Sequence, residues 1–97
     1  MPTFISLIRL SQQGIENIKQ SPARLEAAKK VFKEMGGEIK QNYLVMGQYD
    51  MVLIGEAPDD ETAAKLSLVI GSKGSIRTEI MRAFTEEEYR KIIQALP

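Results

Sequence analysis

The stretch Met46-Gly47-Gln48-Tyr49-Asp50-Met51-Val52 is the most informative part of this sequence. Its glycine supplies the positive φ that a tight connection between two strands needs. The aspartate that follows can accept hydrogen bonds from turn amides, and the tyrosine offers an apolar ring with a polar tip. Because an apolar run continues to Ile54, the stretch predicts a hairpin that leads into a buried strand and forms one wall of a small pocket.

Four strands are predicted on the two sides of this hairpin. Thr3–Leu10 and Met51–Ala57 are apolar on both faces, so they are expected in the middle of the sheet, covered on both sides. Glu38–Met46 and Ser75–Phe84 carry polar positions that are typical of edge strands.

A helix is predicted between the first two strands. It begins at Ser21-Pro22, carries an apolar stripe and ends at Gly36-Gly37, where glycine can take the left-handed conformation of a helix cap. The residues Ser11–Gly14 are expected to break the first strand, and Ile15–Gln20 to form a short helical turn.

Three acidic residues, Asp59–Glu61, open the second helix. Their carboxylates face the unpaired amides and the positive end of the helix dipole, which we favour over a metal site. The glycine-containing loop Gly71–Ser75 follows this helix, so its amides have the wrong polarity for a phosphate cradle, and it predicts a helix cap and turn. Thr85 and Glu88 have the spacing of a capping box that starts a terminal helix.

The order of these elements, β-α-β-β-α-β with an extra C-terminal helix, predicts one α+β domain over residues 1–97, a ferredoxin-like sandwich. Right-handed crossovers put the first and third strands in the middle, and those are the strands with two apolar faces. Two helices cover only one face of such a sheet. The other face would expose a large apolar patch, which predicts a homodimer or a higher homo-oligomer.

Composition excludes several classes of function. Thirteen basic and thirteen acidic residues cancel, so the chain lacks the basic field of a nucleic-acid binder. It has no apolar run of about 20 residues for a membrane span and no signal peptide, which favours a cytoplasmic location. Without cysteine or histidine it has no thiolate or imidazole, so we expect no transition metal, no cofactor and no Ser–His or Cys–His catalysis.

Strand periodicity leaves a few polar groups on or beside the sheet that could bind a ligand. They pair with one another or with a partner subunit, or they converge on a cavity between the sheet and its cover. Asp50 needs hydrogen-bond partners because it enters an apolar strand. The candidate ligand-binding residues are Ser6, Tyr43, Tyr49, Asp50 and Arg82.

The tetrapeptide Gly47-Gln48-Tyr49-Asp50 resembles the signature of the small bacterial and archaeal GYD domain family. Gly36-Gly37, Glu56–Asp60, Gly74–Glu79 and Arg82-Ala83-Phe84 fit the same family. The resemblance implies the dimeric α+β barrel superfamily, in which two ferredoxin-like sheets close face to face. That superfamily includes cofactor-free monooxygenases, lactone isomerases and amino-acid-sensing modules. Its enzymes often use histidine, which this chain lacks.

We therefore expect a cytoplasmic homo-oligomer that binds a small molecule at or beside the interface between two sheets, with no catalytic residues, no nucleic acid and no membrane among its partners. One alternative is a cofactor-independent enzyme, similar to a monooxygenase or isomerase, that uses Tyr49 or Tyr43 with Asp50 and an arginine. Such a tyrosine needs a pKa far from its usual value near 10. The other alternative is a purely structural assembly protein.

Overall fold

The computed structural model describes residues 1–97 and contains a single four-stranded sheet. All neighbouring strands are antiparallel, in the order β2-β3-β1-β4. The prediction that the first and third strands are central is confirmed, and the α+β ferredoxin-like architecture with it. The strands are β1 (Thr3–Leu10), β2 (Glu38–Leu44), β3 (Met51–Glu56) and β4 (Ile76–Ala83).

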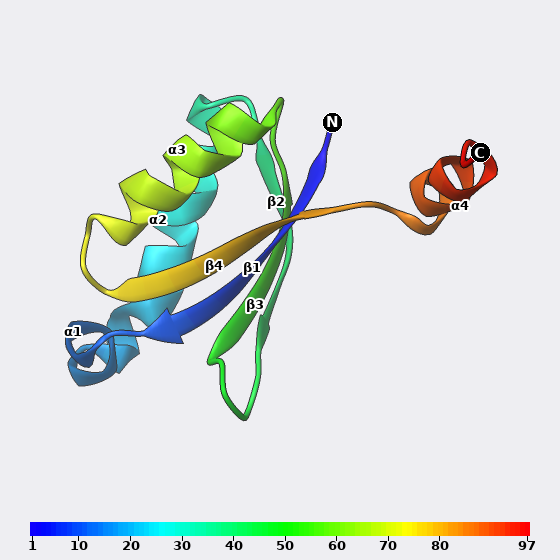
Figure 1. The fold of residues 1–97 in the computed structure, drawn as a ribbon. Coiled ribbons are helices and arrows are strands. Elements are labelled where there is room, and N and C mark those ends of the chain that lie inside the picture. The colour runs from blue at the N-terminus through cyan, green and yellow to red at the C-terminus, as the bar shows by residue number, and fades with distance from the viewer.

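The helices lie on two sides of this sheet. Figure 1 shows α2 and α3 together over one face, and α4 apart from them beyond the end of β4, on the other side of the sheet. The helical elements are α1 (Gln12–Glu16), the 3-10 helix η1 (Ile18–Gln20), α2 (Ser21–Glu34), α3 (Asp60–Gly71) and α4 (Glu86–Gln94).

The buried core lies between the sheet and the pair α2 and α3. Apolar side chains from β1 and β3 meet Phe32 of α2 and Leu66 of α3, and Leu66 is almost completely buried. The core is made of Phe4, Ile8, Phe32, Leu53, Ala57, Ala63 and Leu66.

The opposite face of the sheet has no cover within the chain. The strand register places Ile5 of β1 between Ile54 of β3 and Met81 of β4. Leu7 lies beside Val52 in the same way. Because side chains alternate along a strand, these residues share the face away from α2 and α3. We call this set the uncovered face: Ile5, Leu7, Val52, Ile54 and Met81.

Two local predictions are wrong. The first strand ends at Leu10, as predicted, but the helical turn begins at Gln12 and not at Ile15, so Gly14 lies within α1. The N-cap Ser11 accepts a hydrogen bond at Oγ from the Gly14 amide at 3.2 Å. The second strand ends at Leu44, two residues earlier than expected, so the hairpin connection is longer. Gly47 within that connection has φ +133°, the positive φ that the sequence predicts.

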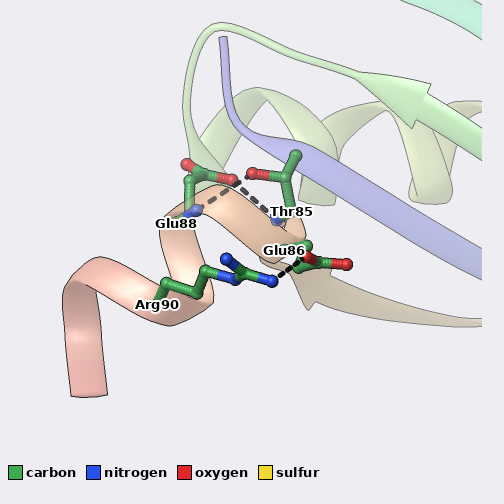
Figure 2. A network of polar contacts seen from close by, with 4 residues as sticks. All are labelled: Thr85, Glu86, Glu88 and Arg90. Carbon is green, nitrogen blue, oxygen red and sulfur yellow. Dashed lines mark hydrogen bonds and ion pairs between the residues drawn. The ribbon is translucent and has the colours of Figure 1, made fainter. Parts of the chain in front are cut away.

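The predicted capping box at the start of α4 is confirmed (Figure 2). The Thr85 amide donates to Glu88 Oε1 at 2.9 Å, and the Glu88 amide donates to Thr85 Oγ1 at 3.2 Å. Arg90 pairs with Glu86 at 2.7 Å one turn apart. The backbone hydrogen bond from Thr85 lowers the pKa of Glu88 below its ordinary value of 4.5.

Replacing the cap should unwind α4, and acid should do the same. Thr85→Ala is expected to cost the helix about 1 kcal/mol, whereas Thr85→Ser keeps the accepting hydroxyl.

The pKa of Glu88 is lowered in the folded state. The contribution of this carboxylate to the stability of α4 is therefore complete above pH 4.5 and is lost as the pH falls through the lowered value. Circular dichroism during acid titration measures this, and an identical titration for Glu88→Gln would contradict it.

Candidate functional site

Asp50 ties the hairpin to the end of β1. Its Oδ2 accepts a hydrogen bond from the Leu10 amide at 2.8 Å, 40 residues away along the chain. Its own amide donates to the Ile8 carbonyl at 2.8 Å, and its carbonyl accepts from the Val45 amide at 2.9 Å. These three bonds satisfy the partly buried aspartate and give it a structural role.

Asp50→Ala is expected to destabilise the fold by about 1–3 kcal/mol, because it leaves the Leu10 amide without its acceptor. Asp50→Asn is the matched control, since its amide oxygen can still accept that bond, and it should lose less. Urea unfolding measures both variants. An unchanged midpoint for Asp50→Ala, combined with lost ligand binding, would make Asp50 a functional residue instead.

Tyr49 borders a small charged pocket at the same end of the sheet. Its hydroxyl donates to Glu79 Oε2 at 3.0 Å, and the Arg9 guanidinium carbon lies 4.9 Å from the centre of its ring. Arg77 is the cross-strand neighbour of Arg9. The pocket holds about 160 Å³ and is lined by Leu7, Arg9, Tyr49, Arg77, Thr78 and Glu79.

The other candidate residues lie elsewhere. Ser6 is buried on the face that α2 and α3 cover. Arg82 lies near the N-terminal end of β1, where its guanidinium is 4.3 Å from the centre of the Phe84 ring. Tyr43 is 50% exposed on the edge strand β2. The structure therefore groups only Tyr49 and Asp50, at the hairpin, and separates the rest.

A larger hollow lies on the helix side of the sheet, and the sequence does not reveal it. It holds about 490 Å³ between α2, α3 and the sheet, and most of its lining is apolar. Strand and helix periodicities identify which faces meet, but they do not determine how far two helices stand apart over a sheet. The apolar walls include Phe4, Ile8, Val31, Phe32, Met51, Leu53, Leu66 and Ile80.

A few polar groups interrupt these apolar walls. Ser67 Oγ and Thr78 Oγ1 share a hydrogen bond at 2.9 Å. Asn42 Oδ1 is buried without any hydrogen-bond partner, and its amide nitrogen reaches only the sulfur of Met51, at 3.8 Å. Lys73 also lines the hollow and forms no ion pair. A mainly apolar hollow with a few polar groups that lack partners is typical of a small-molecule binding site.

The two other motifs that the sequence offered have structural roles. Asp59 is the N-cap of α3, and its Oδ1 accepts from the Thr62 amide at 2.7 Å, a bond that lowers the pKa of the aspartate. The loop after α3 turns at Gly74, with φ +85°, as a helix end should.

No three acidic side chains come together as a metal site. None of the helices is long and apolar enough to cross a membrane.

The fold and the hollow define a small ferredoxin-like α+β protein with one uncovered sheet face. The match to the GYD domain model over residues 4–93 then shows that the chain belongs to the GYD domain family. It is 36% identical over 84 residues to a Thermus thermophilus protein named "Glutamine synthetase and cystathionine beta-lyase binding protein". That match covers 86% of this chain and 88% of the relative.

Two solved structures share the fold. A crystal structure of a Thermus thermophilus protein has a TM-score of 0.56 and 26% identity, and the match covers 88% of this chain and 95% of that one. A feast or famine regulatory protein of Mycobacterium tuberculosis, complexed with L-methionine, has a TM-score of 0.67 and 18% identity. The match covers 88% of this chain but spans 51% of the regulator.

Proposed function

We propose that the protein is a homo-oligomeric binding protein that holds a small, mainly apolar molecule in the hollow between the sheet and the helices α2 and α3. The observation that carries this proposal is the hollow itself. Its volume of about 490 Å³ is within the usual range for ligand pockets, roughly 300–1,000 Å³. Its lining is mainly apolar, so a ligand that buries apolar surface there would be stabilised by leaving water.

The lining suggests the chemistry of the ligand. The apolar walls suit an aliphatic or aromatic body, and Asn42 Oδ1 lacks a donor that a ligand can supply. Lys73, an exposed lysine of the lining, forms no ion pair within the chain and favours an anionic group on the ligand. The one carboxylate in the lining, Glu56, is bound to Lys40 at 3.5 Å. The hydroxyl and amide groups of the lining can orient a ligand through hydrogen bonds.

The Tyr49 pocket is the alternative location, and it is the one that the sequence predicts. Its two arginines and one glutamate suit a small polar ligand with both charges, such as a zwitterion. It holds about a third of the volume of the hollow, and it opens beside the uncovered face. A ligand there would lie at or beside the interface between two sheets.

Calorimetric titration with hexanoate, octanoate and decanoate tests the choice between the two locations. Affinity should rise with chain length, since each buried methylene adds about 0.8 kcal/mol. Ala28→Leu fills part of the hollow and should weaken binding at least tenfold. Ala64→Leu, on the exposed side of α3, is the matched control and should bind as the parent does. Unchanged affinity in Ala28→Leu together with loss in Tyr49→Phe would move the site to the Tyr49 pocket.

A second proposed role is binding to another protein, which the name of the 36% identical relative favours. Leu68 on α3 is an apolar side chain that is 72% exposed, so it is available for such a contact. Sedimentation of this protein mixed with purified glutamine synthetase tests the role. Co-sedimentation at micromolar concentration supports it, and independent migration of the two proteins contradicts it.

A further inference from the structure

The terminal helix α4 has an apolar side that nothing covers. No residue of α4 is buried. Four large apolar side chains in or next to the helix are between 45% and 60% exposed: Tyr89, Ile92, Ile93 and Leu96. Their spacing along the chain, i, i+3, i+4 and i+7, puts them on one side.

The charged side chains on the polar side of α4 have their partners within the helix itself. The capping box closes its first turn, and ion pairs one turn apart join Glu86 to Arg90 at 2.7 Å and Glu87 to Lys91 at 3.5 Å (Figure 2 shows the first pair). A helix of nine residues is marginal in water by itself, so most of its stability must come from packing. Its own chain does not supply that packing, because α4 stands apart from the sheet (Figure 1).

We propose that α4 is an exchanged arm: in the homodimer, the apolar side of α4 from each chain packs against the second copy. This inference rests on the proposed pairing through the uncovered face. The position of α4 favours it, because α4 follows the edge strand β4 and lies on the other side of the sheet from α2 and α3 (Figure 1). A second copy seated on the uncovered face would therefore lie on the same side as α4.

The size of the interface also favours exchange. Four strands about 4.8 Å apart, each about seven residues long at about 3.4 Å per residue, give the sheet a footprint of roughly 450 Å². Stable interfaces bury about 800 Å² of accessible surface per partner. The accessible surface of such a face is larger than its planar footprint, and two exchanged helices would add the apolar side of α4 to the surface that the dimer buries. In a two-fold dimer each copy gives one arm and receives one, so the contact closes without further copies.

Filtered nuclear Overhauser spectroscopy on a mixture of isotope-labelled and unlabelled chains tests the exchange. Methyl groups of Ile92 and Ile93 should show contacts to the unlabelled chain. In parallel, the double variant Ile92→Ser and Ile93→Ser should raise the dimer dissociation constant at least tenfold, while the capping box keeps the helix start. The matched control, Lys91→Ser and Gln94→Ser, changes two residues outside the apolar side and should leave that constant unchanged.

The experiment distinguishes failure of the exchange from failure of the proposed homo-oligomer. If the protein dimerises but the α4 methyls contact only their own chain, or contact nothing, the exchange is overturned and the sheet pairing stands. Equal dissociation constants for the two double variants would overturn it in the same way. If the parent is monomeric at every concentration, the proposed homo-oligomer fails, and the exchange fails with it.

Discussion

Ile5→Lys is expected to abolish the proposed pairing of two sheets and leave a monomer. Ile5 is in the central strand β1, between Ile54 and Met81 on the uncovered face. An ammonium group placed there would be buried without a partner when two sheets pair, at a cost of several kcal/mol. The dissociation constant should therefore rise by about 100-fold or more. The isolated chain should remain folded, because that face is outside its own core.

Sedimentation equilibrium measures this effect, and Leu68→Lys is its matched control. Leu68 is a large apolar residue too, but it is on α3, is 72% exposed and lies away from the uncovered face. We expect Leu68→Lys to sediment as the parent does. A parent species near the chain mass of 10.9 kDa at micromolar concentration, or an Ile5→Lys variant that still dimerises, would refute pairing through the sheet.

Gly14→Ala is expected to destabilise the fold by about 3 kcal/mol. A Cβ atom on Gly14 would lie 2.1 Å from the Ser75 carbonyl oxygen and 3.3 Å from a methyl of Leu10. The carbonyl cannot move aside cheaply, because it is backbone and accepts a hydrogen bond from the Ser11 amide at 3.0 Å. The variant should therefore separate α1 from the start of β4.

Gly71→Ala is the control for this substitution. Apart from its chain neighbours and the backbone of its own helix, no atom lies within 4 Å of a Cβ placed on Gly71, and its φ is not positive. It lies at the end of α3, so alanine should be neutral or stabilise the fold by up to about 1 kcal/mol. Chemical unfolding of both variants measures the difference. Equal midpoints would show that α1 does not approach β4 as closely as the structure indicates.

The local features of this chain were determined by the sequence, because they depend on short-range chemistry. The apolar faces of β1 and β3 and the polar positions of β2 and β4 predict the strand order, since burial on two faces requires a central position. Asp59 and Thr85 cap the helices that the spacing of their neighbours predicts. The tetrapeptide at Gly47 and the motifs elsewhere in the chain predict the GYD domain family, which the family match confirms.

The contacts between distant segments were decided by the tertiary structure alone. The acceptor role of Asp50 toward Leu10 needs the hairpin to fold back on β1, and the crowding at Gly14 needs α1 to approach Ser75. The candidate residues Ser6 and Arg82 lie away from Tyr49 because the register between strands separates them. The volume of the hollow depends on how closely α2, α3 and the sheet pack against one another. Periodicity specifies the direction of a side chain, whereas the distance between packed elements depends on all the side chains between them.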